Sequence, residues 1–335
     1  MKLFVSGGAG YVGSVVVEQL LRDGHQVVVY DDLSTGHASA VAPGARLVVG
    51  DLRDAPALAA ALADGTDAVL HFAAQSIVSE SMRDPIATWD ANLSGALGLL
   101  RAVAEKRVPR FVLSSSAAVY GEPEVQPIPE TEPARPTHAY GGSKRAVEML
   151  LENAAAAFGL RSVFLRYFNA AGASERSGED HDPETHLVPR LLRRALEPGP
   201  AVPLFGDDYP TPDGTCVRDY VHVEDLAEAH ARALAALDAG LRGPLNLGSG
   251  RGSSVREILS CVESVTGRGV PVRVEPRRPG DPPRLVADIR RAAQELGWRP
   301  RRDLAAVVGS AWRWMQLHPR GYGEDGGRGA NAGLD

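Results

Sequence analysis

Three glycines at three-residue intervals, Gly7, Gly10 and Gly13, directly follow a short apolar run over residues 2–6 and open a helical pattern over 11–22. Glycines in this register allow a tight turn, let the backbone approach a pyrophosphate closely, and let a helix pack near its strand. The helix N-terminus adds unpaired N–H groups and the positive end of its dipole. The pattern therefore predicts a strand–turn–helix unit that holds a dinucleotide.

The rest of the chain repeats this alternation of apolar runs and helical patterns. Continuous apolar runs between helices are typical of parallel strands that are covered on both faces. We expect such strands over 2–6, 26–30, 46–49, 68–72, 110–113 and 162–167. A later run over 217–223 is expected to return to the same sheet. The fold class predicted is α/β, a Rossmann-like doubly wound parallel sheet with a smaller α/β C-terminal substrate domain.

The predicted domains follow from changes in composition. The dinucleotide-binding domain is expected to cover residues 1–168 and about 217–240. The substrate domain is expected to cover about 169–216 and 241–318. The last residues, 319–335, are rich in glycine and poor in large apolar side chains, so we expect a disordered tail there.

Composition excludes several classes of function. The net charge is -6, with no basic patch, which argues against a nucleic-acid partner. No apolar run reaches the roughly 18 residues that a membrane span needs, and the N-terminus does not resemble a signal peptide. These features predict a cytoplasmic protein with no membrane partner. The two cysteines, Cys216 and Cys261, cannot by themselves form a disulfide framework or a zinc site.

Two aspartates point to the kind of dinucleotide. Asp31 ends the second apolar run, 18 residues after Gly13, where a carboxylate accepts hydrogen bonds from the adenosine ribose hydroxyls. A carboxylate there repels a 2′-phosphate, so the sequence favours NAD over NADP. Asp51 follows the third run and could face the adenine edge, or instead cap the helix that begins near Asp54.

Tyr140 and Lys144 form the catalytic candidate. They stand four residues apart on a predicted helix, so they share one face of it. Only three of the 36 basic residues are lysines: Lys2, Lys106 and Lys144. A lysine in a chain that otherwise uses arginine is a candidate for a functional role, because the pKa of its ammonium group is easily shifted. A nearby ammonium is expected to lower the tyrosine pKa and favour a phenolate base. Ser114, Ser115 and Ser116 follow the fifth predicted strand, at the carboxyl end of the sheet, where a hydroxyl can hydrogen-bond a reacting hydroxyl group.

These motifs resemble the extended short-chain dehydrogenase/reductase superfamily and, within it, the UDP-glucose 4-epimerase family. The segments that carry the resemblance are GGAGYVGS at 7–14, SSSAAVYGEP at 114–123, YGGSK at 140–144, GEDHDPETHLVP at 178–189 and FGDDYPTPDGTCVRDYVHVEDLA at 205–227. The resemblance implies NAD-dependent interconversion of UDP-glucose and UDP-galactose through a 4-keto intermediate. Tyr140 would be the acid/base, Lys144 its electrostatic partner and Ser116 its helper.

The resemblance also implies the binding residues. Those expected to contact NAD are Gly7, Gly10, Tyr11, Val12, Gly13, Asp31, Asp32, Leu33, Ser34, Thr35, Gly36, Asp51, Leu52, Phe72, Ala73, Ala74, Asn92 and Phe168. Those expected to face the UDP-sugar are Asn169, His186, Leu187, Phe205, Arg218, Arg278 and Asp281. An acidic protein needs local arginines to bind a diphosphate, which supports Arg218 and Arg278 independently.

Some positions depart from the family pattern, and some alternatives stay open. Asp32, Ser76 and Ala91 replace residues that relatives use near NAD, so those contacts are in doubt. Leu285 stands where the family tunes the size of the sugar pocket, and its intermediate bulk leaves a UDP-N-acetylhexosamine or UDP-pentose 4-epimerase as the alternative. The intact Tyr140 and Lys144 argue against a non-catalytic NAD sensor.

Two further expectations concern partners and metals. The family dimerises by packing two helices of each subunit, so we expect a homodimer through helices near 86–105 and 140–158. His181 and His186, with the acidic residues Glu179, Asp180 and Asp182 near them, match no standard metal spacing. We therefore predict loop residues there and no metal.

Overall fold

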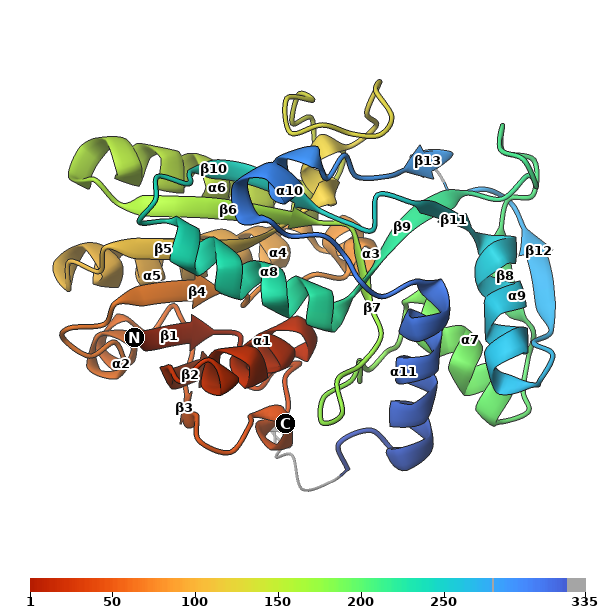
Figure 1. Cartoon of the computed structure of the whole chain (residues 1–335), viewed down its shortest axis with the longest axis horizontal. Helices are drawn as coiled ribbons and strands as arrows, with labels where there is room; N and C mark the ends of the chain where they lie inside the picture. The colour runs from red at the N-terminus through yellow and green to blue at the C-terminus, as the bar shows by residue number, and fades with distance from the viewer. Residues whose placement is uncertain (279, 324–335) are drawn as a thin grey trace, which may run out of the picture.

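A seven-stranded parallel sheet forms the larger part of the protein, in a computed structural model that describes residues 1–278 and 280–323 (Figure 1). The strand order is β3–β2–β1–β4–β5–β6–β10, and every neighbouring pair is parallel. The strands are β1 (Lys2–Ser6), β2 (Gln26–Asp31), β3 (Arg46–Val49), β4 (Ala68–His71), β5 (Arg110–Ser116), β6 (Arg161–Tyr167) and β10 (Gly243–Leu247). This is the predicted Rossmann-like sheet, and its order reverses between β1 and β4, where such sheets bind ligands.

Helices cover both faces of this sheet and bury a separate apolar core on each (Figure 1). One face carries α1 (Tyr11–Arg22), α8 (Val223–Ala236) and α10 (Arg290–Leu296). The other carries α2 (Ala55–Ala61), α5 (Gly95–Glu105) and α6 (Ala139–Phe158). Because both faces are covered, the strands can be apolar along their whole length, which is the pattern the sequence shows.

A smaller α/β lobe lies beyond the carboxyl ends of the strands (Figure 1). Helices α7 (Leu187–Leu196), α9 (Val255–Thr266) and α11 (Leu304–Leu317) pack on one another around a third apolar core. Its strands are β7 (Asn169–Ala171), β9 (Val217–His222), β11 (Gly252–Ser254) and β13 (Arg284–Leu285), with β8 (Val202–Phe205) paired to β12 (Val272–Glu275). The smaller α/β lobe that the sequence predicts is therefore present. A capping box formed by Ser254 and Glu257 opens α9.

Two strands lie in the opposite sheet from the one expected. The sequence predicts that the run over 217–223 returns to the main sheet, but β9 pairs with β7, β11 and β13 in the small lobe. Along β9, buried and half-buried residues alternate over most of its length, which suits an open sheet rather than a fully covered one. The edge of the main sheet is instead β10, whose Leu245 and Leu247 are fully buried. The domain boundaries proposed around these segments remain a prediction.

The predicted helix over 86–105 is broken into pieces. After α3 (Val78–Arg83), α4 (Pro85–Trp89) leads into a π-helical turn over Asp90–Ser94, and α5 continues the axis. The wider turn carries Asn92 into the interior, where it is 3% exposed. Single π-turns inside helices often occur at functional sites. Two short 3₁₀ turns, Ala38–Ala40 and Ala117–Tyr120, complete the elements.

The end of the chain only partly tests the predicted tail over 319–335. Residues 324–335 lie outside the described residues. Within 319–323, the Tyr322 ring stacks on His37 at 4.9 Å and contacts Trp314 at 5.3 Å between centroids. Across residues 1–278 and 280–323, none of the helices combines the length and apolarity needed to cross a membrane.

Candidate active site

The glycine turn between β1 and α1 is built as the sequence predicts. Gly7 has φ +76°, and a Cβ there would stand 2.3 Å from the backbone nitrogen of Ala73, so only glycine fits. A Cβ on Gly13 would stand 2.1 Å from the Gly7 carbonyl oxygen, which shows how closely the helix packs on the turn. A Cβ on Gly10 would meet nothing within 3.5 Å, so its surface is open. Gly10 caps α1 without any side-chain hydrogen bond, which leaves backbone N–H groups available to an anion.

Asp31 lies at the end of β2, beside the glycine turn. Its carboxylate accepts hydrogen bonds from the backbone N–H groups of Ala9 at 2.9 Å and Leu33 at 3.0 Å. Burial raises the pKa of Asp31, and these two hydrogen bonds oppose the rise. The carboxylate thus joins the turn to the segment 32–36. Within that segment, Asp32 accepts from both the N–H and the hydroxyl of Ser34.

Asp51 is committed to an ion pair. Its carboxylate binds the Arg53 guanidinium with two nitrogens, and Arg53 also pairs with Asp90 at 2.6 Å. The hydrogen bonds from Arg53 lower the pKa of Asp51. The alternative role, capping α2, belongs instead to Asp54, which accepts from Ala57 N–H. Asp51 is 39% exposed on its side chain, so an adenine edge can still reach it.

Residues on the neighbouring strand end close the same crevice. The N–H groups of Phe72 and Ala73 both donate to the Ser6 carbonyl, so the segment after β4 lies against the Gly7 turn. Asn92 is expected to contact NAD, but its side-chain amide is occupied otherwise. It accepts from Gln75 N–H at 2.7 Å and donates to the Gln75 carbonyl and to Ser143 Oγ. Asn92 therefore holds the loop at Gln75 against α6.

Tyr140 sits in the first turn of α6, 9% exposed. His138 caps the helix by accepting from Gly141 N–H, and its ring stacks parallel to the Tyr140 ring with centroids 6.1 Å apart. A Cβ on Gly141 would stand 2.4 Å from the Ala118 carbonyl oxygen. The glycine after the tyrosine therefore lets α6 begin directly against the turn that follows Ser116. This brings the phenol to the end of β5.

Lys144 lies one turn further along α6 and is 4% exposed. Its Nζ donates to the Ser114 carbonyl at 2.9 Å and lies 5.9 Å from the centroid of the Tyr140 ring. Burial lowers the pKa of Lys144 to about 8, with the Glu148 carboxylate opposing the shift. The predicted grouping of Tyr140, Lys144 and Ser116 at the carboxyl ends of the strands is thus formed.

The protonation of Tyr140 differs from the expectation. The sequence predicts that Lys144 lowers its pKa, but burial raises the pKa of Tyr140, and a hydrogen bond with Ser116 is what opposes the rise. The charge of Lys144 does not offset the rise in the Tyr140 pKa that burial causes. The interaction that favours the phenolate therefore comes from Ser116, for which the sequence offers the weaker grounds.

A buried polar network that the sequence does not predict lies beneath this site. Glu148 accepts from Arg166 through both carboxylate oxygens, at 2.8 and 2.6 Å, and from the Ser115 hydroxyl at 2.7 Å. Arg166 also donates to the Tyr120 hydroxyl, which donates in turn to Asn246. Glu148 is completely buried, so this pair fixes β5, β6 and α6 to each other. A glutamate four residues after Lys144 on the same helix face is the signal that could have found it.

The predicted substrate residues form two groups. Arg218 on β9 pairs with Asp281, and its neighbour across the strands is Leu285 on β13. The Arg278 guanidinium lies over the Phe205 ring, 3.9 Å from its centroid. Cation–π contact of this kind holds an arginine side chain in place without neutralising it. The structure thus brings together four of the seven residues in two pairs.

The remaining substrate candidates lie at the start of α7 and at β7. His186 is the N-cap of α7 and Leu187 its first residue, while Asn169 begins β7 and is exposed. Arg190, one turn after His186, is not among the predicted residues. Burial lowers its pKa, and the positive charge of Arg278 lowers it further. The two guanidinium groups repel each other, and on a net acidic protein such a pair is suited to bind an anion between them.

The last of the predicted cofactor residues lies at a strand end. Phe168 donates its N–H to the Leu247 carbonyl at 3.1 Å and packs against the apolar cluster of Val119, Tyr120 and Ile128. Leu285 on β13 packs against the same cluster.

Comparison with known proteins agrees with this geometry. Residues 3–248 match the NAD dependent epimerase/dehydratase family. The UDP-glucose 4-epimerase of Lacticaseibacillus casei is 48% identical over 97% of this chain and 99% of its own length. A crystal structure of the Bifidobacterium longum UDP-glucose 4-epimerase with NAD+ and UDP has a TM-score of 0.92, at 35% identity, over 96% of this chain and all of that one.

A third relative bears on the sugar. The UDP-glucose 4-epimerase of Stenotrophomonas maltophila, solved with NAD and formylated UDP-arabinopyranose, has a TM-score of 0.91 at 42% identity. It covers 96% of this chain and 99% of its own. The chain belongs to the NAD dependent epimerase/dehydratase family.

Proposed function

We propose that this family member is an NAD-dependent UDP-glucose 4-epimerase that inverts the C4 centre of the sugar and so interconverts UDP-glucose and UDP-galactose. The observation that carries the proposal is the joining of Tyr140, Lys144 and Ser116 at the carboxyl end of the sheet, beside the glycine turn. Close relatives along nearly the whole chain carry the same name.

The residues around the glycine turn fit NAD. Gly10 is open where Gly7 and Gly13 are tightly packed, and the start of α1 offers backbone N–H groups without a side-chain cap. Asp31 is positioned for the adenosine ribose, with Asp32 to Gly36 lining it, and Asp51 and Leu52 near adenine. NAD held there would supply a hydride acceptor and donor for the inversion at C4.

Tyr140 is proposed to take the proton from the 4-hydroxyl and to return it after the sugar has turned. Burial keeps water away from the phenol, and the Ser116 hydroxyl can donate its one proton either to the phenolate or to the sugar oxygen. Lys144 is held by Ser114 and supplies a positive charge to the site. The sugar must be free to present either face, so the tight contacts belong on the UDP.

The UDP contacts are proposed on the small lobe. Arg278 and Arg190 are suited to the diphosphate, because neither forms an ion pair that the structure shows in the described residues. Arg218 with Asp281 is suited to the ribose and β-phosphate side. His186, Leu187, Asn169 and Phe205 complete the set. Their roles rest on the family resemblance and on these positions.

The sugar itself is the finer part of the proposal. Leu285 pairs with Arg218 across the strands and, like Phe168, packs against Val119, Tyr120 and Ile128, which supports its proposed place beside the sugar. A relative solved with a modified UDP-pentose keeps the UDP-pentose alternative open. UDP-N-acetylhexosamines are the other alternative, and they need more room than the hexose.

A homodimer is proposed through α4 and α6. A groove lined by Trp89, His138 and Met149 runs between these helices, and Ile86 and Met82 nearby are 80% and 64% exposed. Apolar side chains this exposed on adjacent helices indicate a protein interface. A cytoplasmic location stays a prediction from the sequence.

The test uses purified protein without added cofactor. UDP-galactose, UDP-N-acetylgalactosamine and a UDP-pentose are supplied separately, and the epimerised product is separated by chromatography. We expect turnover of UDP-galactose with NAD retained on the protein, and a slower rate for the N-acetyl sugar. Turnover of a UDP-pentose alone would assign the alternative, and no turnover of any of the three would contradict the proposal.

A further inference from the structure

Four potential metal ligands gather in the segment that precedes α7. Among residues 1–278 and 280–323, Glu179, His181, Glu184 and His186 each offer one ligand atom, and all four atoms lie within 4.8 Å of one another. The chain bends at 182–183, which turns the second Glu–X–His pair back onto the first. The spacing matches no standard motif, which is why the sequence predicts no metal here.

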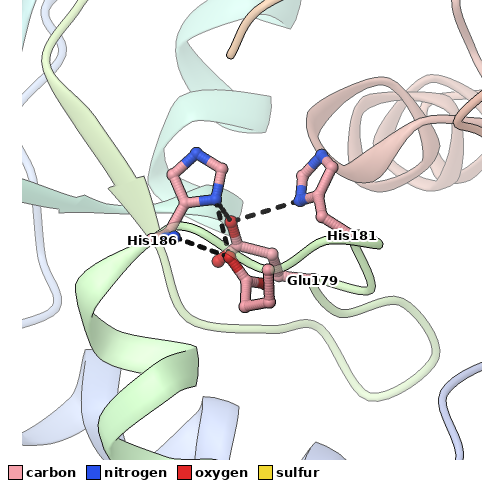
Figure 2. Close-up of side chains that lie close together, drawn as sticks. Glu179, His181 and His186 are labelled. Carbon is pink, nitrogen blue, oxygen red and sulfur yellow. Dashed lines mark hydrogen bonds and ion pairs between the residues drawn. The ribbon is translucent and has the colours of Figure 1, made fainter. Parts of the chain in front are cut away.

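The ligand atoms converge on one point. Figure 2 shows the Glu179 carboxylate directed toward the imidazole rings of both His181 and His186. The Glu179 Oε1 atom is 2.7 Å from His186 Nδ1 and 3.4 Å from His181 Nδ1, and His186 Nδ1 is 3.0 Å from Glu184 Oε1. Ligands about 2.0–2.1 Å from a tetrahedral zinc lie about 3.3 Å apart, so shifts of a few tenths of an ångström would accommodate the ion.

Two of the polar atoms in this cluster are buried without a hydrogen-bond partner. Glu184 Oε1 accepts from the His186 N–H at 2.7 Å, but its other oxygen, Oε2, has none, although the side chain is only 4% exposed. His181 Nδ1 is likewise buried without a well-formed hydrogen bond. An unsatisfied buried carboxylate oxygen is costly. A cation between the four side chains would satisfy both atoms.

We propose that Glu179, His181, Glu184 and His186 form a structural zinc site. Two imidazoles and two carboxylates suit zinc, whereas magnesium and calcium prefer oxygen ligands alone. The hydrogen bond from the His186 backbone N–H to Glu184 Oε1 orients this carboxylate, as hydrogen-bond partners of metal ligands commonly do.

The site would fasten the loop to two parts of the molecule. Its first residues lie beside Asp180, whose carbonyl oxygen is 3.0 Å from His37 Nε2 near the segment that lines the cofactor crevice. Its last residue, His186, is the N-cap of α7, which carries Arg190 one turn later. Zinc at this point would hold the start of α7 in place relative to the large sheet.

Metal content tests the proposal without reference to activity. The protein is produced in zinc-supplemented medium, dialysed against zinc-free buffer, and its metals are measured by mass spectrometry. We expect about one zinc per chain in the unaltered protein and at least about a 100-fold weaker zinc affinity in Glu179→Gln and His181→Asn. The control is Glu175→Gln, the same charge change on an exposed glutamate of the same loop.

Thermal unfolding gives a second readout. After the bound zinc is removed with a chelator, zinc added back at about 100 times its dissociation constant should raise the Tm of the unaltered protein and of Glu175→Gln by about 4 °C, and magnesium should not. If Glu179→Gln fails to fold, the half-buried His181→Asn decides. Absence of zinc from the dialysed protein, or equal zinc uptake and equal Tm shifts in all variants, would overturn the proposal and leave a cluster held by hydrogen bonds alone.

Discussion

Lys144 Nζ donates a hydrogen bond to the backbone carbonyl of Ser114 at 2.9 Å and stands 5.9 Å from the centroid of the Tyr140 ring. The end of β5 therefore positions the ammonium, and the two functional side chains of α6 act from one helix face. Because Ser116 ends the same strand, a single strand end arranges all three catalytic candidates. The phenol of Tyr140 and the hydroxyl of Ser116 are close enough to form a hydrogen bond with each other.

Replacement of the base gives the simplest prediction. Tyr140→Phe should lower kcat by about 10³-fold, because a positioned acid/base contributes roughly 10²–10⁴. The bound NAD should stay, since the ring remains and only the hydroxyl is lost. NAD content by absorbance after denaturation and kcat by product chromatography check both parts. Activity within about threefold of the unaltered protein would rule out Tyr140 as the base.

Lys144→Met separates stability from function. The pKa of Lys144 is about 8 in the folded protein, against an ordinary lysine value of 10.5, so below pH 8 the folded state carries a buried charge. Between pH 8 and 10.5 the unfolded chain keeps a proton that the folded chain has lost, so the stability of the unaltered protein rises with pH relative to the variant. We expect the variant to be more stable at pH 7 by about 3 to 4 kcal/mol, at about 1.4 kcal/mol per pKa unit.

Urea unfolding at pH 7 and pH 10 measures this difference. Most of the extra stability of Lys144→Met should disappear at pH 10. The variant should be inactive at both pH values. A gain that does not change with pH would mean that the lysine is not buried as the structure has it.

The Glu148–Arg166 pair should be essential for stability. Glu148→Gln leaves the Arg166 charge buried and unpaired, which should cost about 3–5 kcal/mol of unfolding free energy. The matched control is Glu152→Gln, one turn later on α6, where a 48% exposed carboxylate pairs with Arg145 and the cost should stay below about 0.5 kcal/mol. Equal effects in the two variants would contradict the buried network.

The glycine turn offers two variants with opposite signatures. Gly13→Ala places a Cβ 2.1 Å from the Gly7 carbonyl oxygen and should lower the Tm sharply, whereas Gly10→Ala has open space at 3.5 Å and should keep the Tm within about 2 °C. Gly10→Ala should nevertheless lose NAD, because the added methyl points where the pyrophosphate approaches. Differential scanning calorimetry with NAD quantitation tests this, and full NAD retention in Gly10→Ala would place the pyrophosphate elsewhere.

Arg278 should act on substrate affinity. Arg278→Met should raise KM for UDP-galactose about 10- to 100-fold, the loss expected for charge-assisted hydrogen bonds, with NAD content unchanged. Arg273→Met on exposed β12 is the control, since Arg273 pairs only with the nearby Glu275 among the described residues. Initial rates over a range of UDP-galactose concentrations decide between the two arginines.

The sequence is informative where one local pattern determines the structure. The Gly7–Gly13 turn, the apolar strands and the spacing of Tyr140 and Lys144 each depend on residues close together in the chain, and all of them form as predicted. The exchange of β9 and β10 between sheets could not be predicted, because a short apolar run does not reveal which edge it will join. The raised pKa of Tyr140 could not be predicted either, because its burial depends on residues far apart in the sequence.

Contacts across long sequence separations account for the rest. Arg166 lies 18 residues from Glu148, and Asn246 lies 126 residues from Tyr120, so their network appears only in three dimensions. Asn92 is buried and bonded to Gln75 through a π-helical turn that no hydrophobic pattern indicates, and its contact with NAD stays a prediction. Spacing alone indicates no metal at Glu179, whereas the fold supplies the convergence of the four side chains.

The most direct test of the central claim uses UDP-galactose that carries deuterium at C4, incubated in ordinary water with the purified protein and no added cofactor. The mechanism moves that deuterium to tightly held NAD and back to the same carbon, so we predict UDP-glucose that retains deuterium at C4, measured by mass spectrometry and NMR. Loss of the deuterium to water, or no conversion by a protein that holds NAD, would contradict the account.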